Sequence, residues 1–171
     1  MPMKLKVKLA NVLAYLPNKS DEGAAAYDLA APVTVELKHG RQIVDLGFQM
    51  ELPHGYGANI QPRSGFSAKG FEVTLVPRFF FFFPFLHICT KRVDADVILG
   101  LVDENYRDNV GVIIKSRYRS IFYKAYIARG TRIAQMRISS IPKTEIEQVD
   151  ELDMSNDRGG GFGHSGTKSK K

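Results

Sequence analysis

Five short segments of the chain combine residue types that could bind a polyphosphate or activate a water molecule. In chain order they are AAAYDLAA (24–31), PRSGFSAKG (62–70), GLVDENYRDNVGV (100–112), RGTRIAQMRI (129–138) and DRGGGFGHSG (157–166). Together they carry arginine, serine, aspartate, tyrosine and glutamine, whose side chains supply charge, hydrogen bonds or a general base. Each segment also has an ordinary structural explanation, and its chemistry must be weighed against that alternative.

The second segment has the composition of a phosphate-binding turn. Arg63 and Ser64 precede Gly65 at the end of an expected strand. An arginine binds phosphate oxygens bidentately, and the hydroxyl and open backbone N–H groups could complete an anion site. A short helix beginning near Ser67 would add the partial positive charge of its N-terminus. The alternative is an ordinary turn with an exposed arginine.

The third segment places an acid and an aromatic residue in an expected hairpin. Asp103 could act on a water molecule as a general base, and the ring of Tyr106 could pack against a sugar. Alternatively, Asp103 is a turn residue and Tyr106 a strand aromatic.

In the first segment, Asp28 suits a turn or a buried hydrogen bond better than a metal site. In the fourth, Gln135 could donate to a phosphate oxygen, although such a glutamine usually faces solvent.

The fifth segment is rich in glycine but is not a Walker loop, because no Gly-Lys-Ser/Thr ending follows. Its glycines would let backbone N–H groups approach phosphates closely. Phe162 has no local core to join, and stacking on a base would explain it. His164 is expected as a polar tail residue and not as a catalyst.

Short strands separated by turns are the elements that must position these segments. Leu5, Val7 and Leu9 alternate with lysines, which is the period of a strand with one apolar face. Further strand-like runs cover 33–37, 43–52, 57–61, 110–114, 121–127 and 132–138. Turn formers separate these runs, and fifteen glycines and eight prolines supply them. The pattern predicts an all-β sandwich or barrel-like fold.

Composition limits the remaining possibilities. A chain of 171 residues suits one domain, and its net charge of +6 is compatible with an anionic substrate, a nucleic acid, a membrane surface or a solvated exterior. Cys89 is the only cysteine, so no intrachain disulfide can form, which fits a reducing compartment. The N-terminal pattern is not that of a secretory signal, and the apolar stretch 79–89 is shorter than the ~20 residues of a spanning helix. We expect a soluble, intracellular protein without membrane or stable nucleic-acid partners.

Taken together and in this order, the five segments resemble the five motifs of the homotrimeric dUTP pyrophosphatase (dUTPase) family. The resemblance implies a distorted jelly-roll subunit of the β-clip type and a homotrimer with shared active sites. It implies hydrolysis of dUTP to dUMP and pyrophosphate, which keeps uracil out of DNA and supplies dUMP for dTMP synthesis. It also implies a β domain over 1–153 and a flexible C-terminal arm over 154–171 that closes over the bound nucleotide.

The resemblance also assigns roles to individual residues. Asp103 matches the catalytic aspartate that activates the attacking water, and Tyr106 matches the residue beneath the deoxyribose. The remaining substrate contacts that it implies are backbone groups around Leu101, Val102 and Gly111 for uracil, the phosphate ligands Arg63, Ser64, Gly65 and Gln135, and the arm residues Arg158, Phe162 and Gly163. In-line attack on the α-phosphorus would require Mg²⁺, held by phosphate oxygens and waters instead of a protein cage. Asp28 would contact that ion only through a bound water.

Four departures from the family pattern stand out. The largest is 76–99, because deleting it would join GFEVTL to GLVDENYRDNVGVII. We therefore expect an insertion, either a lineage-specific loop or translated non-coding sequence such as a retained intron, since five consecutive Phe codons are pyrimidine-rich. Asp108 stands where the family usually has glycine, and Thr131 where it usually has aspartate. The arm has one residue fewer than usual between Arg158 and Phe162.

Two other functions compete with dUTP hydrolysis. One is a dCTP deaminase-like activity on the same fold, and the other is a non-catalytic nucleotide-sensing or interaction protein. The Asp-x-x-Tyr hairpin at 103–106 and the Gly-Gly-Phe-Gly arm at 160–163 favour the pyrophosphatase over the deaminase. Retention of Asp103, Arg63, Gln135 and Phe162 argues against a protein without turnover.

Overall fold

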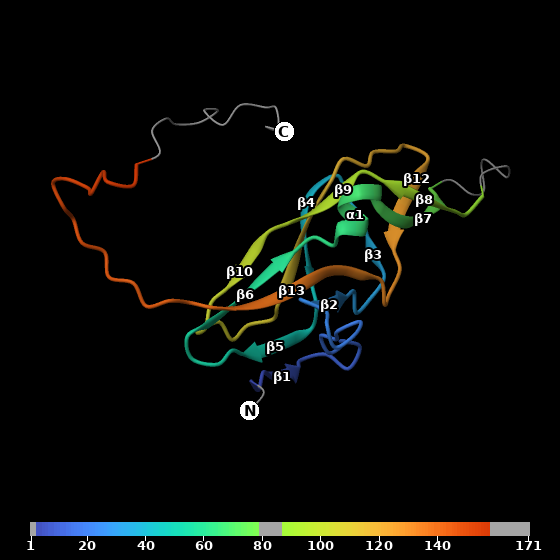
Figure 1. Ribbon diagram of the computed structural model, residues 1–171. Helices are drawn as coiled ribbons and strands as arrows, with labels where there is room; N and C mark the ends of the chain where they lie inside the picture. Colours follow the sequence, from blue (N-terminus) through green and yellow to red (C-terminus); the bar gives the residue numbers. More distant parts are fainter. Residues whose placement is uncertain (1–2, 79–86, 158–171) are drawn as a thin grey trace.

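The computed structural model describes residues 3–78 and 87–157, which form thirteen short strands and one helix (Figure 1). The strands are β1 (Lys6–Leu9), β2 (Tyr27–Ala30), β3 (Val35–Glu36), β4 (Gly40–Asp45), β5 (Phe48–Glu51), β6 (Tyr56–Gln61), β7 (Phe71–Pro77), β8 (Cys89–Val93), β9 (Ala95–Ile98), β10 (Gly100–Val102), β11 (Gly111–Ser116), β12 (Tyr123–Ile127) and β13 (Arg132–Ser140). The helix, α1 (Ser64–Lys69), begins three residues before the expected start at Ser67. The expected all-β fold is confirmed.

The strands pair antiparallel in four small sheets. Their orders are β1-β5, β10-β6-β13-β2, β4-β11-β9 and β3-β12-β7-β8. Inward-facing side chains of these sheets share one core, in which Phe48, Phe71, Ile114, Ile127 and Met136 are almost fully buried. Period-two alternation explains this packing, because successive side chains of a strand point to opposite faces.

The segment expected as an insertion, 76–99, is largely built into these sheets. β8 pairs with β7, with Phe71 opposite Val93 and Leu75 opposite Cys89, while β9 pairs with β11. The side chains of Val93, Ala95 and Val97 are buried in the common core. The described part of this segment therefore belongs to the sheets and the core and not to a loop outside them. The phenylalanine run at 79–83 lies among residues 79–86, outside the described residues.

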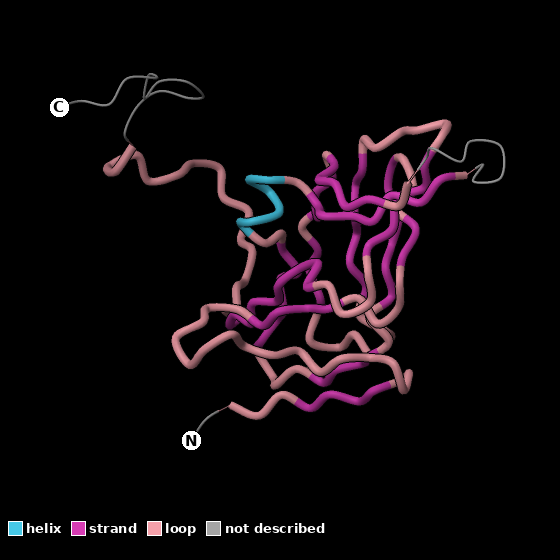
Figure 2. Tube along the Cα trace, turned by 90° about the vertical axis from the view of Figure 1, so that its right-hand side faces the viewer, coloured by secondary structure: helices cyan, strands magenta, loops and turns pink. Residues whose placement is uncertain are grey.

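The chain after β13 leaves the body of the domain. Every residue from 141 to 157 is exposed. The ribbon in Figure 1 and the tube in Figure 2 both show this stretch running away from the sheets. Its apolar side chains are open to solvent, and Ile146 is 99% exposed. No helix in the described parts of the chain has the length and apolar character needed to cross a membrane.

Candidate functional site

Three motif segments meet because β2, β13 and β6 are neighbours in one sheet. Gln135 on β13 lies opposite Asp28 on β2 and opposite Gln61 on β6. Arg63 follows the end of β6 and directly precedes α1. The first, second and fourth segments, which are far apart in sequence, therefore lie side by side at this end of the sheet.

The carboxylate of Asp28 holds two arginines in place. Its Oδ1 is 3.0 Å from Nε of Arg63, and its Oδ2 accepts a hydrogen bond of 2.9 Å from Arg132. The Asp28 side chain is only 17% exposed, so solvent screens these ion pairs less than it screens surface pairs. Arg63 also donates to the backbone carbonyl of Arg132 at 3.2 Å. The guanidinium of Arg63 is thus fixed in direction before any ligand arrives.

A hollow of about 420 Å³ opens beside these groups. It contains the predicted phosphate ligands Arg63, Ser64, Gly65 and Gln135 together. Gln135 donates its side-chain amide to the carbonyl of Pro62 at 3.0 Å, which fixes it against the turn that carries Arg63. A Cβ atom built on Gly65 would meet nothing within 4 Å, so the backbone there is open to a ligand. The structure therefore brings the four phosphate candidates into one polar cavity.

Two further cations line the same hollow and were not anticipated from the sequence. Lys69 ends α1, and Arg92 comes from β8, where it faces Glu72 at 3.7 Å. Lys69 lies in the PRSGFSAKG segment, so its place in that motif could have identified it as a phosphate contact. Nothing in the sequence connects Arg92 to that motif, because the β7–β8 pairing alone brings them together. The phosphate hollow is accordingly more basic than the motif alone predicts.

A second hollow, of about 250 Å³, lies between β10 and β11. It is lined mainly by apolar side chains and includes the predicted uracil contacts Leu101, Val102 and Gly111 with Tyr106. The hydroxyl of Tyr106 donates to the carbonyl of Asn109 at 2.9 Å, which orients the ring. A Cβ atom on Gly111 would come within 2.8 Å of Cγ2 of Ile43, so glycine is required by this close approach. The cavity suits a flat, mostly apolar group.

Asp103 lies on the turn between β10 and β11, where its side chain is exposed to solvent. The backbone N–H of Tyr106 donates to its carbonyl at 3.1 Å, which closes the turn. The next residue, Glu104, accepts hydrogen bonds from the N–H of Gly55 at 2.6 Å and from the imidazole of His54 at 2.7 Å. The hydrogen bond from His54, followed by that from Gly55, lowers the pKa of the Glu104 carboxyl.

Asp103 and Arg63 lie at opposite ends of β6 in one chain. Val102 pairs with Ala58 near the start of β6, so Asp103 continues towards residue 57, whereas Arg63 lies beyond the strand's other end. Six extended residues span about 20 Å, which neither side chain can bridge. The two hollows also have no lining residue in common. One chain therefore presents two separate hollows.

Some predicted residues cannot be placed. Arg158, Phe162 and Gly163 lie outside the described residues. Within 3–78 and 87–157, no group of three or more His, Cys, Asp or Glu side chains could hold a metal ion. Both oxygens of Asp28 face guanidinium groups, so its carboxylate is not arranged as a direct metal ligand.

The sequence matches the model of the dUTPase family over residues 13–77 and 91–166. The unmatched interval is thus 78–90, which is shorter than the expected insertion 76–99. The match to both flanking parts agrees with the burial of Val93, Ala95 and Val97 in the core.

Two curated relatives illustrate the similarity along the whole chain. The deoxyuridine 5'-triphosphate nucleotidohydrolase of Gloeothece citriformis is 33% identical over 168 residues, covering 98% of this chain and 99% of that protein. The protein of the same name from Clostridium acetobutylicum is also 33% identical, covering 97% of this chain and 99% of its own length.

Solved structures share the fold. The dUTPase of Staphylococcus bacteriophage 80alpha with dUPNHPP is 25% identical with a TM-score of 0.71, and the alignment covers 96% of this chain and 99% of that one. A mutant dUTPase from phage phi11 of S. aureus, described with a coordinated structural Mg(II) ion, gives a TM-score of 0.66 at 22% identity and covers 87% of this chain and 98% of its own.

Proposed function

The chain belongs to the dUTPase family, and we propose how its two hollows carry out the hydrolysis of dUTP to dUMP and pyrophosphate. The enzyme is a dUTP diphosphatase, and the observation that carries this conclusion is the family match over residues 13–77 and 91–166. The reaction keeps uracil out of DNA and supplies dUMP for dTMP synthesis. Roles of individual residues, the metal ion and the subunit arrangement are the proposal.

The triphosphate binds in the hollow that contains Arg63, Ser64, Gly65 and Gln135. Arg63 is the main ligand, because its guanidinium is oriented by Asp28 and can form paired hydrogen bonds with phosphate oxygens. The open backbone at Gly65 allows close approach of a phosphate group. Pre-orientation of these groups lowers the entropy lost when the substrate is held for attack.

Uracil and deoxyribose bind in the apolar hollow between β10 and β11. Backbone groups at Leu101, Val102 and Gly111 read the edge of the base, while the ring of Tyr106 packs beneath the sugar. The close approach of Gly111 to Ile43 supports this assignment, because a narrow cavity would reject the methyl group of thymine.

Asp103 acts as the general base. Its exposed carboxylate takes a proton from the water that attacks the α-phosphorus in line, and pyrophosphate leaves. The arm residues Arg158, Phe162 and Gly163 complete the site by closing over the nucleotide and excluding other water. Exposure of the whole stretch 141–157 supports an arm that leaves its own domain.

Mg²⁺ is the proposed cofactor, and it would neutralise charge on the triphosphate during attack. The donor set fits an ion held by phosphate oxygens and waters, since the described residues contain no cluster of acidic or imidazole ligands. Asp28 would reach such an ion only through a water, because its oxygens already hold Arg63 and Arg132.

The site is shared between subunits, and we assign a homotrimer. The argument for sharing is the distance of about 20 Å along β6 between Asp103 and Arg63 of one chain. A base that deprotonates the water attacking the α-phosphorus and an arginine that binds the same triphosphate must lie closer together than this. Asp103 of one copy therefore works with Arg63 of another. The number of three subunits follows from the resemblance of the five motifs to the homotrimeric family.

Pyrophosphate release with dUTP, dTTP and dCTP as separate substrates tests the function. With Mg²⁺ present, only dUTP should yield pyrophosphate at a substantial rate, and dCTP should yield no ammonia.

Mixing inactive Asp103→Asn and Arg63→Ala subunits tests whether the site is shared between subunits. Mixed trimers should regain activity at sites that combine an intact Arg63 with an intact Asp103. Mixed trimers with no more activity than either parent would contradict a shared site.

A further inference from the structure

Glu104 links the turn that carries Asp103 to the neighbouring turn between β5 and β6. We infer that Glu104 is a positioning residue for Asp103, with Gly55 and His54 as its anchor. The inference rests on the proposed function, since it concerns the base of that reaction. It assigns a role to a contact between residues that are about fifty positions apart in the sequence. None of these residues lines either hollow.

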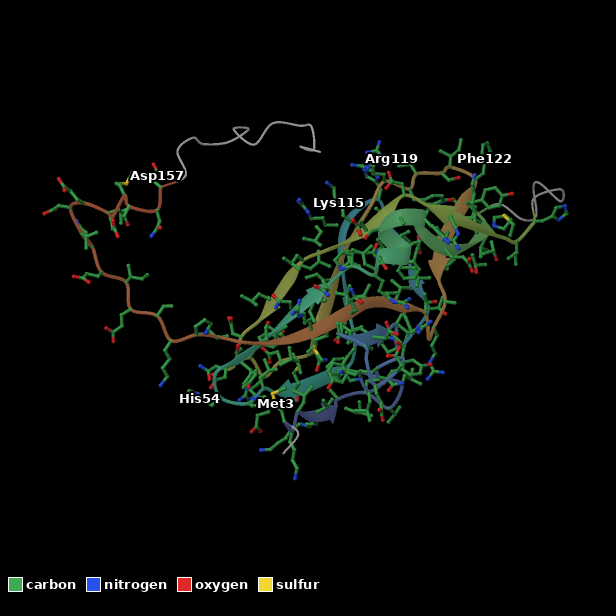
Figure 3. All side chains as sticks on the ribbon, viewed as in Figure 1. Met3, His54, Lys115, Arg119, Phe122 and Asp157 are labelled. Atoms are coloured by element: carbon green, nitrogen blue, oxygen red, sulfur yellow. The ribbon has the colours of Figure 1, made fainter. Side chains whose placement is uncertain are left out.

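The carboxylate of Glu104 uses both oxygens for this link. Oε2 accepts the N–H of Gly55 at 2.6 Å, and Oε1 is 2.7 Å from Nδ1 of His54. Hydrogen bonds to an ionised carboxylate are short and roughly twice as strong as neutral ones. His54 and Gly55 form the turn between β5 and β6, at the end of the molecule away from Lys115 and Arg119 (Figure 3).

The anchor is itself well defined. The N–H of Tyr56 donates to the carbonyl of Pro53 at 3.1 Å, which closes the β5–β6 turn. Gly55 has φ +77°, a conformation that glycine adopts without steric cost and that presents its N–H to Glu104. Glu104 therefore attaches the catalytic turn to the hydrogen-bonded turn between β5 and β6.

The catalytic turn is closed by its own hydrogen bonds, and the pairing of Val102 with Ala58 places its start beside β6. Tyr106 donates its backbone N–H to Asp103, and Arg107 donates to the carbonyls of Glu104 at 2.6 Å and Tyr106 at 2.9 Å. These bonds fix the shape of the turn, and Glu104 adds the side-chain contact that fastens the position directly after Asp103 to the β5–β6 turn. Because Asp103 directly precedes Glu104, a shift of the Glu104 side chain moves the base with it.

Placement of a base matters more for rate than for stability. A misplacement of about 1 Å can lower the rate roughly 10²-fold, whereas an exposed ion pair contributes little to folding. Loss of Glu104 should therefore lower kcat while the fold persists. An ion pair that only stabilises the fold would show the reverse pattern.

The experiment compares variants of the full chain at a temperature far below their melting points. Glu104→Ala removes the link, Glu104→Gln keeps an oxygen for the N–H of Gly55, and His54→Ala removes one of the two anchors. Glu36→Gln is the matched control, because Glu36 contacts Lys124 at 3.1 Å and is 32% exposed, against 27% for Glu104, at the other end of the domain. The readouts are kcat and KM for dUTP, the melting temperature, and hydrogen exchange of a peptide covering 103–110.

We expect kcat to fall at least about ten-fold in Glu104→Ala, with a smaller rise in KM and faster exchange of the 103–110 peptide. Glu104→Gln should retain part of the rate, His54→Ala should lose least, and Glu36→Gln should match the unmodified enzyme. If Glu104→Ala does not fold, the Gln and His54 variants carry the same comparison.

Two outcomes would overturn the inference. One is a folded Glu104→Ala enzyme with unchanged kcat, and the other is a loss of rate in Glu36→Gln equal to that in Glu104→Gln. Failure of the proposed function is a separate result, because the unmodified chain would then leave dUTP intact. The exchange comparison of 103–110 still tests the attachment in that case.

Discussion

The guanidinium Nε of Arg63 lies 3.0 Å from Oδ1 of Asp28, so the predicted phosphate ligand is held by a carboxylate from a neighbouring motif. The contact depends on the sheet order β6-β13-β2, which brings the two segments to the same end of the sheet. The sequence predicted Asp28 as a hydrogen-bonding carboxylate instead of a direct metal ligand, and its contacts with Arg63 and Arg132 have this character. It orients an arginine and does not hold a metal ion directly.

Replacing Asp28 by Asn should weaken substrate binding more than it slows the chemical step. The neutral amide cannot hold Arg63 and Arg132 as ion-pair partners, and hydrogen bonds to charged groups contribute about 1.5–3 kcal/mol. We expect KM for dUTP to rise roughly ten-fold or more while kcat changes less. Asp94→Asn is the control, because it breaks the exposed pair with Arg117 at 2.9 Å. Equal KM values for the two variants would contradict the role of Asp28.

Arg92 should contribute to substrate binding in the phosphate hollow, although it lies on β8. Arg92→Ala removes one cation from the cavity that contains Arg63. Charge interactions at exposed positions contribute about 0.2–1 kcal/mol, so KM should rise roughly two- to five-fold with kcat almost unchanged. The effect should fade at high salt because exposed charges are screened. Steady-state kinetics at low and high ionic strength measure this, and a KM that is unchanged at low salt would exclude Arg92 from binding.

Gly111→Ala should disturb the apolar hollow. The added Cβ would lie 2.8 Å from Cγ2 of Ile43, and overpacking of this kind costs about 1–3 kcal/mol. We expect KM for dUTP to rise and the melting temperature to fall. Adding Ile43→Ala to Gly111→Ala should restore part of both, because the space is regained. A double variant no better than Gly111→Ala would show that the two side chains do not interact.

The carboxyl of Glu104 predicts a pH dependence of stability. Its folded-state pKa is lowered, chiefly by the hydrogen bonds from His54 and Gly55, with a smaller contribution from the charge of Arg107. A lowered pKa stabilises the fold at pH values above the ordinary carboxyl pKa, and this contribution is lost as the pH falls through the folded-state pKa. The stability difference between the unmodified enzyme and Glu104→Gln should therefore shrink between neutral pH and a pH below the ordinary carboxyl pKa. Urea unfolding at both pH values measures it, and a constant difference would contradict the contact.

The sequence predicted the all-β fold because period-two alternation is clear at 5–9 and further strand-like runs, such as 110–114, recur along the chain. The motif residues were identified individually, and the structure places Arg63, Ser64, Gly65 and Gln135 in one cavity. Their separation from Asp103 along β6 was not visible in the sequence, because strand pairing between distant segments decides it. Arg92 was missed for the same reason.

The strands within 76–99 were not predicted, because the whole segment was interpreted as an insertion whose deletion would join GFEVTL to GLVDENYRDNVGVII. Beyond the phenylalanine run, Val93, Ala95 and Val97 alternate with two aspartates, which is a strand signal of the kind used elsewhere. The structure buries these three side chains in the core. The strand pattern at 93–97 was present in the sequence but was not recognised next to the phenylalanine run.

The central claim is that Asp103 activates the water that attacks bound dUTP, and its substitution by Asn tests this most directly. Pyrophosphate release with Mg²⁺ and dUTP binding should be measured on the unmodified enzyme and on Asp103→Asn, which keeps the shape of the side chain but is not a base. The predicted result is binding within a few-fold of normal and a kcat lower by about 10²–10⁴-fold. Turnover by Asp103→Asn at the unmodified rate would contradict the account.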